Sequence, residues 1–64
     1  MYYCIKVRKQ GGITYYTLVN MYNSLDILKL DEHDLKIYLI TGMIAVSNMF
    51  LGDDGSLQVE KVLV

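Results

Sequence analysis

YYCIKVRKQGGITYYTLVNM, residues 2–21, consists of two runs rich in aromatic and β-branched residues that are joined by two glycines. Strands favour these residue types, and Gly11-Gly12 suits a type I′ turn because both of its central residues need a positive φ. We therefore expect a hairpin whose strands cover residues 2–9 and 13–21. The turn fixes the register, which pairs Val7 with Tyr16, Ile5 with Leu18 and Tyr3 with Asn20.

The predicted register gives the hairpin two distinct faces, because successive strand residues point to opposite sides. The inner face is mostly apolar and consists of Tyr3, Ile5, Val7, Tyr16 and Leu18. The outer face is mixed and pairs Arg8 with Tyr15, Lys6 with Thr17 and Cys4 with Val19. A shift of one residue would destroy this separation, so the pattern favours one register over its neighbours.

Residues 22–42 predict a turn, a short extended segment and a helix. Tyr22-Asn23-Ser24 has the composition of a turn, and residues 25–30 follow as the extended segment. Asp31 is the predicted N-cap, and the acidic residues after it suit the positive end of the helix dipole. Gly42 is predicted to end the helix in the left-handed conformation. The apolar stripe at helical spacing consists of Leu35, Tyr38 and Leu39.

Residues 43–64 predict a second hairpin. Two β-favouring runs, residues 43–51 and 56–64, flank Gly52-Asp53-Asp54-Gly55, and Asp-Gly is a strong hairpin signal. The strand over Leu57–Val64 is expected either to pair inside the sheet or to build a dimer. The predicted fold is a single small α+β domain over residues 1–64. It has a mostly antiparallel sheet of two hairpins and a short strand, with one short helix packed on it, in the order ββ(β)αββ.

The composition indicates a small protein that leaves apolar surface exposed. The chain has 64 residues, of which 53% are hydrophobic, and a domain of about 60 residues buries only about 60% of the surface of its unfolded chain. We therefore expect a homodimer or a partner protein to cover part of this surface. A single cysteine excludes an internal disulfide, and the sequence shows neither a signal peptide nor an apolar run of membrane-spanning length. These features predict a soluble, cytoplasmic protein.

Residues 30–57 combine a helix stop with a hairpin motif. The pattern is Gly42, then Ile44-x-Val46-x-Asn48, then Asp54-Gly55-x-Leu57, and residues 16–20 supply a strand before the helix. In these features the chain resembles a family of small uncharacterised proteins from phages and mobile elements of Gram-positive bacteria. The resemblance implies a setting in the bacterial host cell, where short proteins often bind and inhibit a host protein, such as a defence component, or associate with themselves. It implies no enzymatic activity.

The side chains that could carry chemistry have simpler structural interpretations. His33 lies between Glu32 and Asp34, which would suit a metal site or an acid–base pair, but adjacent helical residues do not share a face. No second histidine or cysteine lies at metal-ligand spacing, so a solvated first helical turn is the preferred interpretation. Cys4 is expected to be a packed strand residue, and Asp53-Asp54 to form a turn rather than a calcium site. We therefore predict a protein that is not an enzyme, with no catalytic residue, metal or cofactor.

The most suggestive cluster combines cations with aromatic residues on the hairpin. The candidate interaction face consists of Tyr2, Lys6, Arg8, Tyr15 and Thr17. Tyrosine and arginine are enriched at the centres of protein interfaces, so binding of a host protein is the first hypothesis for this face. Nucleic-acid binding through stacking and phosphate contacts is the second, although a net charge of −1 argues against it. A small-ligand sponge at an oligomer interface is the third hypothesis. An ordinary amphipathic sheet face without a binding role is the structural alternative to all three.

Overall fold

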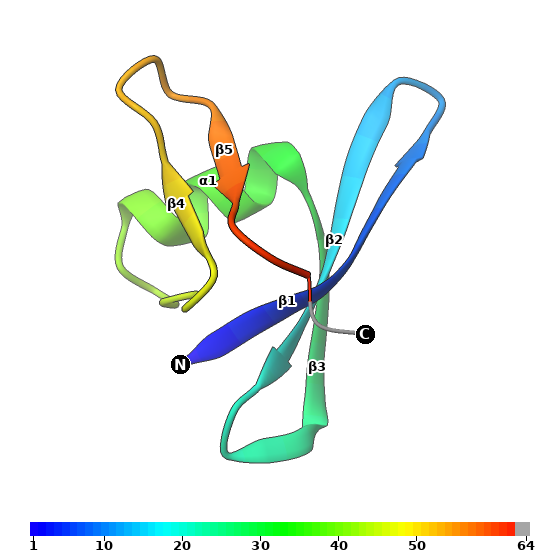
Figure 1. Ribbon diagram of the computed structural model, residues 1–64, viewed down its shortest axis with the longest axis vertical. Helices are drawn as coiled ribbons and strands as arrows, with labels where there is room; N and C mark the ends of the chain where they lie inside the picture. The colour runs from blue at the N-terminus through cyan, green and yellow to red at the C-terminus, as the bar shows by residue number, and fades with distance from the viewer. Residues whose placement is uncertain (63–64) are drawn as a thin grey trace.

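The computed structural model describes residues 1–62 and has a small α+β fold (Figure 1). The elements of these residues are β1 (Tyr2–Gln10), β2 (Ile13–Asn20), β3 (Asn23–Asp31), α1 (Glu32–Ile40), β4 (Met49–Leu51) and β5 (Leu57–Val59). β1, β2 and β3 form an antiparallel sheet in sequence order, and β4 pairs with β5 in a separate sheet. The predicted fold class and element order are therefore confirmed, whereas the placement of both hairpins in one sheet is wrong.

The first hairpin has the predicted turn. Gln10 pairs with Ile13, and Gly11 and Gly12 have φ angles of 60° and 79°, as a type I′ turn requires. Near the turn the predicted register is confirmed, with Lys6 opposite Thr17, Val7 opposite Tyr16 and Arg8 opposite Tyr15.

The first half of β1 departs from the prediction because of a β-bulge at Ile5. The register shifts between Cys4 and Lys6, so that Cys4 rather than Ile5 lies opposite Leu18. An extra residue in one strand reverses the faces that the preceding residues occupy. The residues before the bulge are therefore on the faces opposite to those predicted, with Cys4 inside beside Leu18, Tyr3 outside beside Val19 and Tyr2 inside beside Asn20.

The bulge also changes which side chains form the inner face. Cys4 is completely buried, whereas Val7, which the sequence places inside, is 40% exposed, and Tyr3 and Ile5 are only half-buried. The side-chain amide of Asn48 accepts a hydrogen bond from the Cys4 N–H at 2.7 Å and donates one to the Cys4 carbonyl at 3.0 Å. Asn48 therefore satisfies the backbone of Cys4 in the way that a neighbouring strand would.

β3 is a complete strand rather than a short extended segment. It pairs antiparallel with β2, and Leu28 lies opposite Leu18. The connecting turn is Met21-Tyr22, where the Asn20 side chain accepts a hydrogen bond from the Tyr22 N–H at 2.8 Å. The turn predicted at residues 22–24 is therefore misplaced, because residues 23 and 24 already belong to the strand.

α1 begins and ends where the sequence predicts. The Asp31 Oδ1 atom accepts a hydrogen bond from the Asp34 N–H at 2.8 Å, which makes Asp31 the N-cap. At the other end Gly42 has a φ of 74°. Two backbone hydrogen bonds of the Schellman pattern close the helix, from Gly42 to Leu39 and from Met43 to Tyr38. The predicted helix stop at Gly42 is therefore confirmed.

We expect Gly42→Val to destabilise the protein by about 1–3 kcal/mol, because a β-branched residue is strained at positive φ. A Cβ at this position meets no atom within 4 Å, so the cost arises from the backbone conformation and not from a clash. Thermal unfolding followed by circular dichroism should show a lower Tm, by about 4–8 °C for each kcal/mol. Gly42→Asn is the matched control, since asparagine tolerates this region. An equal loss in both variants would contradict the backbone explanation.

The second hairpin is shorter than predicted. β4 and β5 pair at three positions, Met49 with Val59, Phe50 with Gln58 and Leu51 with Leu57. The predicted turn is confirmed, because Gly55 has a φ of 82° and the Gly52 N–H donates to the Ser56 carbonyl at 2.8 Å. Residues 43–48 are not a strand, although Val46 forms a bridge with Tyr2. Of the predicted last strand, residues 57–59 pair with β4 instead of the main sheet, and residues 63–64 lie outside the described residues.

The hydrophobic core lies between the three-stranded sheet, α1 and the second hairpin (Figure 1). Its buried members are Cys4, Tyr16, Leu18, Leu35, Val46 and Met49. They come from β1, β2, α1, β4 and the segment before β4, so the two sheets share one core. Large apolar side chains also remain exposed, among them Tyr22, Leu25, Ile40 and Met43, as the composition predicts for so short a chain.

Candidate functional site

The outer face of the three-stranded sheet carries rows of side chains that cross all three strands. One row is Lys6, Thr17 and Lys29, the next is Arg8, Tyr15 and Asp31, and a third is Tyr3, Val19 and Ile27. Paired residues of neighbouring antiparallel strands lie about 4.5–5.5 Å apart and point to the same side. We call the surface formed by these three rows the outer face.

An open depression of about 300 Å³ lies on two of these rows. It is lined by Lys6, Arg8, Tyr15, Tyr16, Thr17 and Lys29, and we call it the basic depression. The guanidinium carbon of Arg8 lies 5.5 Å from the centroid of the Tyr15 ring, which is within the range of a cation–π contact. This contact favours a position of the Arg8 side chain over the sheet, beside the two lysines.

The basic depression concentrates positive charge in a chain whose net charge is −1. Three of the chain's six lysine and arginine residues line it. In residues 1–62, no ion pair joins any of these three cations to a carboxylate. Asp31 shares a row with Arg8, but its Oδ1 atom accepts the helix-capping hydrogen bond from Asp34. The depression therefore presents hydrogen-bond donors and positive charge without an ion-paired acid.

Four of the five residues of the predicted interaction face meet in the basic depression: Lys6, Arg8, Tyr15 and Thr17. The placement of Tyr2 beside them is wrong, because the bulge at Ile5 turns Tyr2 to the inner side of the sheet. Lys29 is absent from the predicted interaction face, because the sequence predicts residues 25–30 to be a short extended segment without a strand partner. The alternation of Ile27 and Lys29 with more buried leucines was the available signal.

Tyr2 belongs instead to a polar cluster that joins β1, β2 and β3. The Asp26 Oδ2 atom accepts hydrogen bonds from the Tyr2 hydroxyl at 2.7 Å and from the Asn20 side-chain amide at 3.1 Å. The bond from Tyr2, supported by the bond from Asn20, lowers the pKa of Asp26 below its ordinary value, because both donors favour the charged carboxylate. The hydrogen bond to Asp26 raises the pKa of Tyr2. These contacts account for Tyr2 as a structural residue.

The lowered pKa of Asp26 predicts a stability contribution that acid removes. Because the folded pKa lies below the unfolded one, the contribution is present above about pH 4 and is lost as the pH falls through the folded pKa. We expect Tyr2→Phe to lower the urea midpoint at neutral pH, and the difference from the wild type to shrink near pH 2. Tyr3→Phe removes a hydroxyl from the opposite face and serves as the control. If the difference in urea midpoint between Tyr2→Phe and the wild type stayed constant with pH, the proposed dependence on the ionisation of Asp26 would be contradicted.

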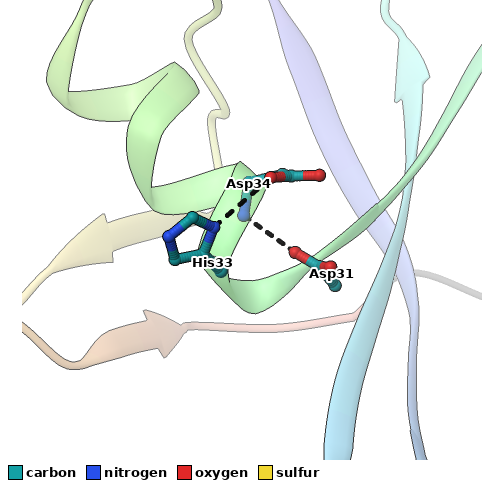
Figure 2. A group of neighbouring side chains, drawn as sticks. All are labelled: Asp31, His33 and Asp34. Carbon is teal, nitrogen blue, oxygen red and sulfur yellow. Dashed lines mark hydrogen bonds and ion pairs between the residues drawn. The ribbon is translucent and has the colours of Figure 1, made fainter.

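A group of potential metal ligands lies at the start of α1 (Figure 2). Ligand atoms of Asp31, His33 and Asp34 all lie within 4.8 Å of one another. His33 Nδ1 is 3.4 Å from Asp34 Oδ1, so the expectation that these neighbours do not meet is wrong. Both side chains are largely solvent-exposed, and the capping bond between Asp31 and Asp34 explains why the group is compact. Helix capping therefore accounts for this cluster, and we assign no metal role to it.

The other candidates for chemistry have structural roles. Burial raises the pKa of the Cys4 thiol, and its Sγ–H donates to the Lys6 carbonyl at 3.5 Å, so this thiol is not activated as a nucleophile. Asp54 Oδ1 accepts hydrogen bonds from the N–H and the hydroxyl of Ser56 at 3.0 and 2.6 Å. These bonds lower the pKa of Asp54 and stabilise the turn of the second hairpin.

Comparison with protein-family models, with curated proteins and with solved structures found no match for this chain. The similarity of residues 30–57 to small phage proteins therefore stays a prediction. In the described part of the chain, no helix has the length and hydropathy needed to cross a membrane.

Proposed function

We propose that the protein is a non-enzymatic interaction protein that binds another protein through its outer face. The observation that carries the proposal is the basic depression, where Lys6, Arg8, Lys29 and Tyr15 meet and no carboxylate of residues 1–62 is ion-paired with the three cations. Arginine and tyrosine are enriched at positions where interface substitutions are most costly. A partner with an acidic surface would gain ion pairs here without first breaking any ion pair within the described residues.

Exposed apolar side chains support a protein partner over a purely ionic one. Ile27 lies in the row next to Lys29 and is exposed, so apolar and charged contacts are available on the same face. Tyr22, in the β2–β3 turn, and Leu25, near the start of β3, are 87% and 90% exposed. Protein interfaces combine apolar and polar side chains, and the outer face offers the exposed Ile27 beside Lys29.

The proposed setting is a phage or mobile-element protein in the cytoplasm of a bacterial host. The resemblance of residues 30–57 to such proteins supports this setting, and the proposed action is to cover and inhibit a host protein, such as a defence component. Self-association is part of the same proposal, because the exposed apolar surface is large for the size of the chain. Light scattering after size-exclusion chromatography should give twice the 7.4 kDa of one chain. A monomer at high micromolar concentration would contradict the homodimer.

Affinity capture from a Gram-positive bacterial lysate tests the outer face directly. We expect the wild type to retain a host protein that is lost with the double variant Lys6→Glu, Arg8→Glu. The matched control is Lys9→Glu, Lys36→Glu, which reverses two charges on other surfaces of the folded protein. Equal capture by all three proteins would show that the outer face does not carry the interaction.

Nucleic-acid binding is the second candidate, and the position of the Tyr15 ring beneath Arg8, in the depression that Lys6 and Lys29 also line, favours it. Aromatic side chains and cations on a sheet can stack bases and hold phosphates. Filter binding of single-stranded DNA and RNA should then show retention that falls steeply as salt increases. Absence of retention at low salt, where ionic contacts are strongest, would exclude this candidate.

A further inference from the structure

We infer that the basic depression is a binding site for a phosphomonoester dianion, the terminal phosphate group of a small molecule. The inference rests on the proposed role of the outer face as a binding surface and names the chemistry that this surface accepts. It concerns Lys6, Arg8, Thr17 and Lys29, which line the depression together.

The hydrogen-bond donors of the depression lie in two neighbouring rows of the outer face. Thr17 lies in β2 between Lys6 of β1 and Lys29 of β3, and all three residues line the depression. Arg8 lies two residues beyond Lys6 on the same face of β1 and is held over Tyr15. Lysine and arginine side chains only donate hydrogen bonds, and a threonine hydroxyl can donate one. The three cations and the hydroxyl can therefore surround one group of acceptor oxygens.

The charge of the depression matches a phosphomonoester better than a carboxylate. A phosphomonoester carries about two negative charges at neutral pH and three strong acceptor oxygens, whereas a carboxylate carries one charge and two oxygens. None of the three cations forms an ion pair with a carboxylate of residues 1–62. A single carboxylate ligand would therefore neutralise only one of the three positive charges. A phosphodiester of a nucleic acid also carries a single charge per group, so the same comparison favours a terminal phosphate.

The size of the depression also suits a small ligand. Its volume of about 300 Å³ lies at the lower end of the range of roughly 300–1,000 Å³ for small-molecule sites. Because the depression is open to solvent, the remainder of the ligand can extend along the sheet beyond the phosphate. The Tyr15 ring beside the cations is the side chain placed to contact that remainder.

Titration of the purified 64-residue protein tests the site. Four probes are added separately and followed by amide chemical shifts: inorganic phosphate, ribose 5-phosphate, adenosine 5′-monophosphate and adenosine. We expect saturable binding of the three phosphates with a Kd of about 1 mM or tighter, with shifts centred on residues 6–8, 15–17 and 29. Adenosine should not bind. Binding of adenosine as tight as that of its monophosphate, or no saturation by any phosphate, would overturn the inference.

The pH dependence of binding separates a dianion from other anions. The second pKa of a phosphomonoester is about 6, so its dianion falls about tenfold between roughly pH 7.5 and pH 5. The affinity for ribose 5-phosphate should fall by a similar factor. Sulfate keeps two charges over this range and reports any titration of the protein, including that of nearby Asp31 or Glu32. Equal pH dependence for both anions would overturn the assignment to a phosphomonoester.

Variants of exposed lysines identify the residues involved. Lys6→Ala and Lys29→Ala should each weaken binding of ribose 5-phosphate by about tenfold, as expected for the loss of a hydrogen bond between charged groups. Lys9→Ala removes the same charge from β1, but its side chain points to the other side of the sheet, and it should leave the affinity unchanged. An equal effect of Lys9→Ala would show that only net charge matters and would overturn the site.

The outcome for the phosphate site can be distinguished from the outcome for the proposed function. If phosphates fail to bind but the Lys6→Glu, Arg8→Glu variant loses its host protein, the outer face is a protein interface without a phosphate site. If phosphates bind but capture is the same for all variants, the site stands and the proposed protein interface fails.

Discussion

Leu18→Ala should destabilise the protein by about 2–5 kcal/mol, the range for removing a completely buried leucine side chain. Leu18 is 0% exposed, and it lies in the central strand between Cys4 and Leu28. Total stability of about 0.05–0.15 kcal/mol per residue makes this loss large enough to unfold a substantial fraction of a chain this small. Urea unfolding followed by far-ultraviolet circular dichroism measures the effect.

Leu25→Ala is the matched control for this prediction. It makes the same chemical change in the same sheet, but the Leu25 side chain is 90% exposed. Its effect should stay within about 0.5 kcal/mol, as is usual for surface substitutions. Similar urea midpoints for the two variants would mean that the shared core beneath β2 does not stabilise the protein as described.

Asn48→Ala should have the second largest effect, a loss of about 2–4 kcal/mol, because it leaves several backbone groups without partners. The Asn48 side chain bonds both the N–H and the carbonyl of Cys4 and also donates to the Lys61 carbonyl. The backbone carbonyl of Asn48 accepts a hydrogen bond from the Glu60 N–H. One residue therefore connects β1, the segment before β4 and the segment after β5.

Asn23→Ala is the control for Asn48, since the Asn23 side chain accepts one exposed hydrogen bond, from the Leu25 N–H. Asn48→Asp adds a second comparison, because a carboxylate can accept from the Cys4 N–H but cannot donate to the Cys4 carbonyl. We expect the order of stability, measured by urea midpoint, to be wild type, Asn23→Ala, Asn48→Asp and Asn48→Ala. A neutral Asn48→Ala would show that this side chain does not connect the two hairpins.

Local signals predict the turns and helix ends well. Gly11-Gly12, Asp31, Gly42 and Gly55 each have a backbone or capping requirement that only a few residue types meet, and each lies where the sequence predicts. These features depend on neighbours within a few residues. For that reason a single sequence contains the information needed to place them.

Features that depend on distant residues could not be predicted in the same way. The bulge at Ile5 is accompanied by bonds between Cys4 and Asn48, which is 44 residues away. Lys29 joins the candidate site because β3 pairs with β2, and the alternation in residues 25–30 was too short to establish this pairing. Four residues of the candidate interaction face could be identified because they lie on the hairpin between the bulge and the turn.

The bulge at Ile5 divides β1 into two segments, of which the first contributes to the core and the second is exposed. Residues 2–4 place Cys4 in the core and connect Tyr2 to Asp26, so changes there should alter folding. Residues 6–10 are exposed, and Lys6 and Arg8 lie on the outer face. The side chains of the proposed binding surface can therefore change while the folding requirements of β1 stay the same. Substitutions in β1 should therefore be tolerated by the fold on the C-terminal side of residue 5 and not on its N-terminal side.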